Sequence, residues 1–227
     1  MNKTTQILLL SLAMSQMAVM CNPSVNDCEE GHYCFDVAIR NKADLEELKG
    51  ITHVEGRVDI EESSLKNLNG LEHLEYVEDG LYINSNEVLT DIKGLRSLKT
   101  IGKKRCSREC NLEIRNNSAL VSLNGLENLE IIYDWLFISF NQSLENLDGL
   151  SNLEEVEDSI YISDNDSMTS ISGLFYLKRV GGNEVQIDDN PELSQCQVDK
   201  FEEYLKTKEF SGNFIYQGND ESETCEE

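Results

Sequence analysis

The chain has 227 residues, and its 43 acidic residues against 19 basic ones give a formal net charge of -24. This length allows one sizeable domain, and the 39% hydrophobic and 27% charged content indicates a globular chain rather than a disordered one. A surface this acidic repels phosphate groups, so neither nucleic acid nor anionic lipid is an expected partner.

The N-terminus has the pattern of an export signal. Lys3 supplies a positive charge, and the apolar run from Ile7 to Met14 is too short to span a bilayer. We therefore expect residues 1–20 to be a signal peptide. Small residues at Ala13 to Ser15 suit a signal peptidase, whereas AVMC, ending at Cys21, resembles a bacterial lipobox whose cysteine carries lipid. The expected location is the bacterial outer membrane or cell surface as a lipoprotein, or the medium as a secreted protein, with membrane contact only through the lipid anchor.

Seven cysteines are an odd number for an exported protein, which a lipidated Cys21 would explain. The remaining six fall into neighbouring sets, although spacing alone does not determine their pairing: Cys28 with Cys34, Cys106 with Cys110, and Cys196 with Cys225. The alternative is that Cys21 is a free or cross-linking thiol. The three histidines, His32, His53 and His73, are not spaced with cysteines as ligand pairs, so we expect no metal site and no cofactor.

An internal repeat dominates the sequence from residue 44 onward. Copies aligned on the pattern LxGLxxL begin at Leu65, Leu89, Leu120, Leu144 and Met168, with a partial copy at Leu193, at steps of 24, 31, 24, 24 and 25 residues. A shorter copy begins at Asp44. Such a period predicts stacked units that bury their apolar sides against each other.

Each class of position in the repeat has a physical role. Five aliphatic residues recur in every full copy, and a pair such as Leu81 and Ile83 flanks one outward residue, which is strand alternation. A glycine at one fixed point, for example Gly149, indicates positive φ or close approach between coils. We expect a buried ladder of corner asparagines that bond to turn backbone: Asn86, Asn117, Asn141, Asn165 and Asn190. The three-to-four spacing of the leucines then reflects short runs and bends rather than a helix.

The pattern LxxLxGLxxLxxVxxxLxIxxN resembles the receptor L-domain, the leucine-rich β-helical module of insulin and EGF receptors, especially its stand-alone versions on bacterial exported lipoproteins. The resemblance covers about Tyr33 to Tyr216. It implies an all-β fold, a right-handed parallel β-helix or solenoid of about six coils. The alternative is an ordinary leucine-rich repeat horseshoe, because LYINSN also matches LxLxxN. One L-domain without a spanning helix or a kinase does not imply receptor signalling.

The C-terminal part of the repeat region resembles the closing element of that family. Val198, Phe201 and Leu205 are spaced for a short amphipathic helix, Gln197 to Lys206, that closes the open end, and Asn213 to Gln217 is expected to add a last strand. The predicted organisation is a signal peptide (1–20), an N-terminal tether (21–32), the repeat domain (33–217) and an acidic tail (218–227).

No catalytic constellation is present, so we expect no enzyme but a binding or scaffold module for a protein or glycan. The outward strand positions form one row: Asp59, Tyr82, Glu113, Phe137, Tyr161 and Gln186. Family resemblance implies ligand binding on a sheet face, so Tyr82, Phe137, Tyr161 and Trp135 are the expected binding residues, exposed as one patch. The alternatives are that the rings only stabilise neighbouring strands, and that the protein is a structural envelope lipoprotein without a specific ligand. The one basic segment, Gly102 to Cys110, is expected to be a solvated insertion, with a docking role as its alternative.

Overall fold

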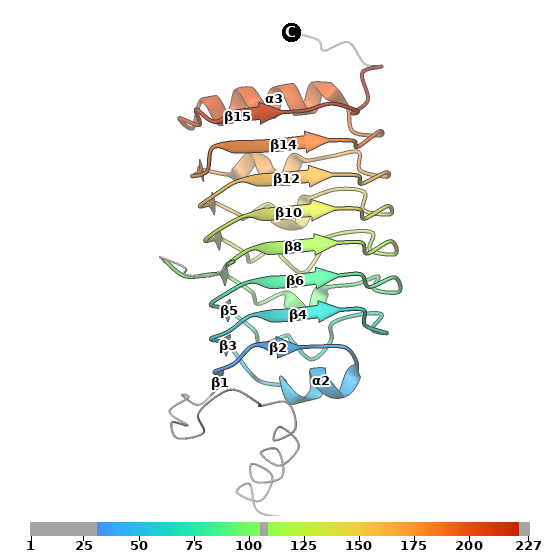
Figure 1. The fold of residues 1–227 in the computed structure, drawn as a ribbon, viewed down its shortest axis with the longest axis vertical. Helices are drawn as coiled ribbons and strands as arrows, with labels where there is room; N and C mark the ends of the chain where they lie inside the picture. Colours follow the sequence, from blue (N-terminus) through green and yellow to red (C-terminus); the bar gives the residue numbers. More distant parts are fainter. Residues whose placement is uncertain (1–30, 105–108, 223–227) are drawn as a thin grey trace, which may run out of the picture.

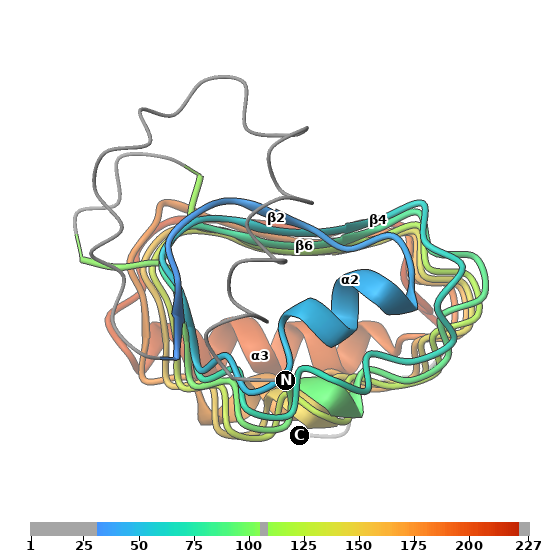
Figure 2. The ribbon, with the colours of Figure 1, turned by 90° about the horizontal axis from the view of Figure 1, so that it is seen from below.

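The computed structural model describes residues 31–104 and 109–222. Within them the chain consists mostly of parallel strands in two sheets, with few helices. Except for the last strand, successive strands alternate between the sheets, so the chain winds into coils stacked along one axis (Figure 1). The outlines of these coils superimpose when viewed along that axis (Figure 2). This arrangement is a β-solenoid, as the repeat predicts.

The first sheet contains short strands of two residues each. Its spatial order is β1 (His32–Tyr33), β3 (His53–Val54), β5 (Tyr76–Val77), β7 (Thr100–Ile101), β9 (Ile131–Ile132), β11 (Glu155–Val156) and β13 (Arg179–Val180). Each strand after β1 contributes one buried residue, such as Val156, to the core. This sheet therefore forms one narrow wall of the solenoid.

The second sheet is wider and flatter, and it forms the long upper wall in Figure 2. Its order is β15 (Asn213–Ile215), β14 (Glu184–Asp188), β12 (Ile160–Ser163), β10 (Leu136–Ser139), β8 (Leu112–Arg115), β6 (Leu81–Asn84), β4 (Val58–Glu61) and β2 (Val37–Ala38). All neighbours are parallel, and their register aligns equivalent residues of the repeat, for example Ile138 beside Ile114 and Ile162. One face of this sheet consequently carries the aliphatic columns and the other carries the outward row.

The aliphatic columns form one continuous core. All five aliphatic positions of the copy that begins at Leu144 are completely buried, and so are both strand aliphatics Leu136 and Ile138. On the third side of three coils the leucines bend through 3-10 turns at η2 (Lys93–Leu95), η3 (Asp148–Leu150) and η4 (Ser172–Tyr176). The prediction of short runs and bends is therefore incomplete, because some of these bends are helical turns.

The fixed position of the repeat requires glycine for different reasons in different copies. Gly125 has φ +119°, a conformation that side chains disfavour. Gly149 has no positive φ, but a Cβ there would lie 2.1 Å from the backbone oxygen of Leu123 in the preceding coil. At Gly149 the close packing of coils, rather than a turn, requires the absence of a side chain.

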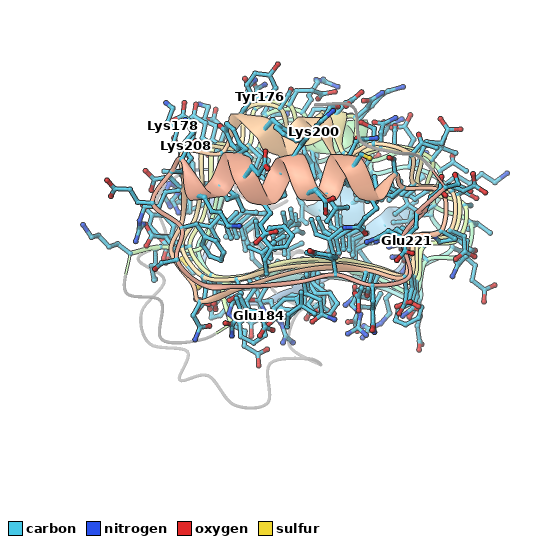
Figure 3. All side chains as sticks on the ribbon, turned by 90° about the horizontal axis from the view of Figure 1, so that it is seen from above. Tyr176, Lys178, Glu184, Lys200, Lys208 and Glu221 are labelled. Atoms are coloured by element: carbon cyan, nitrogen blue, oxygen red, sulfur yellow. The ribbon has the colours of Figure 1, made fainter. Side chains whose placement is uncertain are left out.

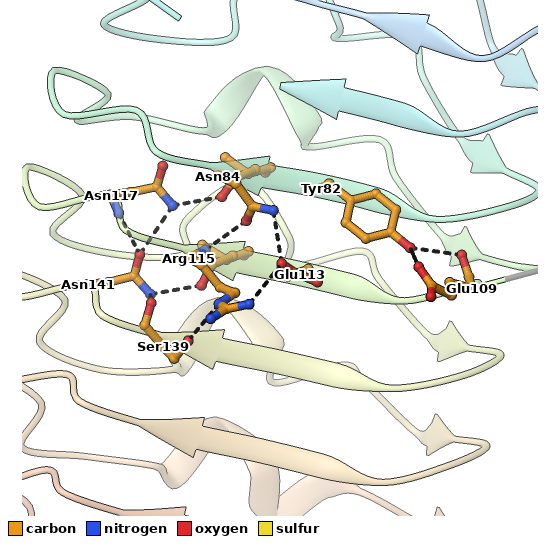
Figure 4. Close-up of polar contacts among 10 residues, drawn as sticks. Tyr82, Asn84, Glu109, Glu113, Arg115, Asn117, Ser139 and Asn141 are labelled. Carbon is orange, nitrogen blue, oxygen red and sulfur yellow. Dashed lines mark hydrogen bonds and ion pairs between the residues drawn. The ribbon is translucent and has the colours of Figure 1, made fainter. Parts of the chain in front are cut away.

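Corner asparagines connect the coils through the core. The backbone N–H of Asn117 donates to Asn141 Oδ1 at 3.1 Å, and Asn141 Nδ2 donates to the Ile114 carbonyl at 2.9 Å (Figure 4). The five asparagines of the expected ladder are completely buried, and the same pattern continues to Asn219, one position beyond the predicted ladder. Buried turn donors and acceptors are thereby satisfied.

Helices lie at the two ends of the stack. The helix α3 (Gln195–Lys206) begins two residues before the predicted start and buries Val198, Phe201 and Leu205. It lies across the C-terminal end beside β15 (Figure 1). The helix α2 (Lys42–Glu47) differs from the expectation, because the repeat pattern predicts a shorter copy from Asp44 in this segment. It lies within the coil outline at the other end (Figure 2).

Candidate binding face

The outer face of the eight-stranded sheet carries the side chains that the repeat directs outward. Strand alternation turns Leu136 and Ile138 into the core, so Phe137 between them faces out. Parallel register then places Phe137 beside Glu113 on one neighbouring strand and beside Tyr161 on the other. The expected row is present as a set of neighbouring positions.

Three aromatic side chains gather at the middle of this face. The rings of Phe137 and Tyr161 stack with their centroids 5.4 Å apart, and the Trp135 ring lies 5.3 Å from that of Tyr161. Trp135 is 38% exposed, whereas the other two side chains are half-buried. We call Trp135, Phe137 and Tyr161 the aromatic cluster, and its geometry is that of a stacking surface.

The expectation that Tyr82 is exposed with these residues is wrong, because Tyr82 is only 6% exposed. Its hydroxyl donates to the Glu109 carbonyl at 3.0 Å, and the Arg57 guanidinium lies over its ring at 5.3 Å. Burial, with the nearby Glu109 carboxylate, raises the pKa of the Tyr82 hydroxyl. Arg57 and Glu109 thus cover Tyr82. In the row, Glu113 lies between Tyr82 and the aromatic cluster.

On the side of the aromatic cluster that faces the N-terminal coils, Arg115 neutralises the charge of Glu113. The Arg115 guanidinium lies 4.8 Å from the centre of the Phe137 ring, pairs with Glu113 at 3.5 Å, and donates through Nε to Ser139 Oγ at 3.2 Å (Figure 4). Asn84 Nδ2 donates to the same Glu113 carboxylate at 2.9 Å. On this edge of the cluster, the charged groups of Arg115 and Glu113 are paired with each other and hydrogen-bonded to neighbouring side chains.

The C-terminal side of the aromatic cluster is acidic. The Tyr161 hydroxyl donates to Glu184 Oε1 at 2.9 Å, and Glu184 projects from the outer face of the sheet (Figure 3). Burial raises the pKa of the Tyr161 hydroxyl, and the bond to Glu184 raises it further. No arginine, lysine or histidine of the described chain pairs with Glu184.

Asp188 lies on β14, two residues beyond Gln186, and is an unusual carboxylate. It is 6% exposed; its Oδ2 accepts a bond from Gln186 Nε2 at 2.9 Å, but its Oδ1 has no hydrogen-bond partner among the described residues. Burial raises the pKa of this carboxyl group, and Asp189 and Asp164 raise it further. A buried carboxylate oxygen without a donor is costly for the fold.

Sequence reasoning missed Arg57, Arg115 and Asp188 because it considered only the central outward position of each strand. Arg115 is two positions after Glu113, and Asp188 is two positions after Gln186. Both therefore point outward like the central residue of their strand. The alternation that identifies Phe137 would therefore have identified them, had the adjacent outward positions been read as well.

Some of the remaining predicted sites lie within the described residues and others do not. Cys34, Cys110 and Cys196 each take part in a disulfide, but Cys21, Cys28, Cys106 and Cys225 lie outside the described residues, so the lipidation and the pairing stay predictions. Residues 105–108 of the basic segment also lie outside the described residues, so the role of this segment stays a prediction. Residues 31–104 and 109–222 contain no cluster of three or more metal-binding side chains and no helix long and apolar enough to cross a membrane.

Comparison with known proteins identifies a family through the first part of the solenoid. A family model described as the receptor L domain matches residues 31–148, just over half of the chain. Receptor L domains are binding domains in general rather than enzymes. No curated protein matches the chain.

Proposed function

The chain belongs to the receptor L domain family, and we propose that it is a non-enzymatic binding module that recognises a protein or glycan through the aromatic cluster. The single observation that supports this function most is the exposure of Trp135 next to the stacked Phe137 and Tyr161 rings. Exposed aromatic side chains on a flat, rigid sheet are effective binding anchors.

The position of the aromatic cluster supports a binding role rather than a purely internal one. Rings that only stabilise neighbouring strands gain by being covered, as Tyr82 is by Arg57. Trp135 instead stays partly open to solvent, at the edge of the strand β10. Exposed apolar area of this kind marks interaction surfaces on soluble proteins.

Capture experiments with the full chain test this function. The double substitution Phe137→Ser and Tyr161→Ser should abolish the capture of partners from envelope fractions and glycan arrays. The matched control replaces Tyr76 and Tyr176, exposed aromatic residues on β5 and η4 away from this face, by serine. Equal capture by wild type and by both double variants would eliminate the proposal and favour the structural alternative, an envelope protein without a specific ligand.

We propose further that the protein is exported and held at the membrane by lipid on Cys21, with a repeat domain over residues 33–217. Mass spectrometry of the native protein should find Cys21 as the acylated first residue. An unmodified N-terminus at Gln16 would contradict the lipid anchor and leave secretion as the alternative. Non-reducing peptide maps test the proposed pairs Cys28–Cys34, Cys106–Cys110 and Cys196–Cys225.

A further inference from the structure

Two places on the outer sheet face repeat one arrangement of three groups. Arg57 pairs with Asp59 at 2.8 Å and lies over the ring of Tyr82. Arg115 pairs with Glu113 and lies over the ring of Phe137. In both places the arginine and its carboxylate belong to one coil and the ring belongs to the next. A guanidinium between a ring face and a carboxylate gains from both, because the ring attracts cations and the carboxylate pairs with them.

The third ring of the row lacks such a cation. The preceding coil offers Tyr161 only Trp135, Phe137 and Ser139, none of which is charged. Among the described residues no lysine or arginine lies over the Tyr161 ring, although carboxylates are present on the following coil, at Glu184 and Asp188. The ring and the acidic groups are thus in place while the cation is missing.

We infer that this third place takes two neighbouring arginine side chains from a basic segment of a protein partner: one lies over Tyr161 and pairs with Glu184, and the other pairs with Asp188. This inference rests on the proposed function and specifies the chemistry of its partner. A net charge of -24 attracts a basic segment and disfavours an acidic one.

Asp188 provides the independent reason to expect a donor from outside. Its Oδ1 has no hydrogen-bond partner among the described residues, so an approaching guanidinium would satisfy a group that the described chain leaves without one. Turning this carboxylate outward breaks the bond from Gln186 Nε2. Arginine fits better than lysine, because its planar group presents several donors and also stacks on rings.

Trp135 makes the inference measurable. It is the only tryptophan of the chain, so the intrinsic tryptophan fluorescence of the full-length protein reports on the aromatic cluster itself. The probe is the acetylated hexapeptide Arg-Gly-Arg-Gly-Arg-Gly, and its control replaces each arginine by citrulline, which has the same shape without the charge. At an ionic strength of about 0.1 M, the arginine peptide should give a saturable change and the citrulline peptide should give none.

A pair of double variants separates a local site from general attraction to an acidic protein. Glu184→Gln with Asp188→Asn should weaken binding of the arginine peptide by about tenfold, because both carboxylate partners of its guanidinium groups are lost. Glu154→Gln with Asp91→Asn changes the net charge equally at residues outside this sheet, before β11 and before η2, and should leave the affinity nearly unchanged. Circular dichroism checks that each variant is folded.

Three outcomes overturn the inference. Equal binding of the arginine and citrulline peptides would show that no cation is recognised, a comparison that needs only the wild-type chain. Equal weakening by both double variants would show attraction by net charge alone. A fluorescence change with neutral oligosaccharides but none with the arginine peptide would assign the face to glycans. If the Phe137 and Tyr161 double variant still loses its captured partner, the proposed function stands even when this inference fails.

Discussion

Asn141 shows how one residue type can hold a solenoid together. Its Nδ2 donates to the carbonyls of Ile114 and Ser139, and its Oδ1 accepts from the backbone of Asn117. Asn165 and Asn190 make the same two kinds of bond, so these three asparagines satisfy backbone groups in their own coil and in a neighbouring one. Water has no access to these groups, because the side chain is completely buried.

Replacing Asn141 by alanine should therefore lower the free energy of unfolding by about 1–3 kcal/mol, the cost of leaving buried backbone groups unpaired. Chemical denaturation measures the change. Asn183→Ala is the matched control, because Asn183 is exposed and precedes β14. A loss at position 141 no larger than the loss at position 183 would mean that the ladder does not stabilise the fold.

Replacing Asp188 should raise the stability of the protein, whereas replacing Asn141 should lower it. Burial raises the folded-state pKa of its carboxyl group, so the folded protein binds this proton more tightly than the unfolded chain does. The cost of holding the charged form is fully present above the folded-state pKa, and it disappears as the pH falls to the ordinary aspartate pKa of about 4. Asp188→Asn should thus stabilise the protein at pH 7, with an advantage that shrinks toward about pH 4.

Denaturation midpoints of wild type and Asp188→Asn across this pH range measure the effect. An advantage that stays constant down to pH 4 would contradict a perturbed carboxyl group at this position. If the asparagine variant is also the weaker binder of the arginine peptide, Asp188 exchanges stability for binding, which is common at functional sites.

Single residues of the strands were predictable where alternation alone decides their direction. Phe137 and Trp135 lie on the outer face for this reason. The burial of Tyr82 was not predictable, because it depends on Arg57 from another coil and on Glu109, which lies in the inserted segment Gly102 to Cys110. Contacts between coils depend on side-chain reach, which the period of the sequence does not encode.

At the scale of elements, the repeat predicts strands well and end structures poorly. The segment of α2 carries leucines at spacing three, which also fits the repeat. A helix forms there instead, with a capping box between Asn41 and Asp44, and it buries Leu45. That Asn-x-x-Asp spacing was the readable signal of a helix start.

Burial in the leucine columns predicts how much one leucine of a single coil contributes to the free energy of unfolding. Leu147 is completely buried in the turn that precedes η3, so Leu147→Ala should cost about 2–5 kcal/mol in the free energy of unfolding. Val121→Ala serves as the control, because Val121 is 43% exposed and belongs to the preceding copy. Thermal and chemical denaturation should agree, and similar small effects for both variants would place Leu147 outside the core.

At the scale of the whole molecule, a stack of coils has two open ends that must be covered. Each inner coil is covered by its neighbours, but an end coil would expose its aliphatic columns to water. The amphipathic pattern of α3 was readable from the sequence, whereas its aromatic partners were not, since Phe175 and Phe214 come from η4 and β15. We propose that α3 is the cap of the C-terminal end.

This proposal predicts a graded loss of structure when the cap is weakened. Phe201 is completely buried on α3, with its ring 5.4 Å from that of Phe175 and 6.2 Å from that of Phe214. Phe201→Ala removes these contacts at a cost of about 3–5 kcal/mol. If α3 acts as a cap, hydrogen exchange should accelerate first in β14 and β12, and later in β6 and β4. Lys200→Ala, an exposed neighbour on the same helix, should leave the exchange pattern unchanged. Uniform acceleration in all strands would mean instead that the solenoid unfolds as one cooperative unit, with α3 as an ordinary part of its core.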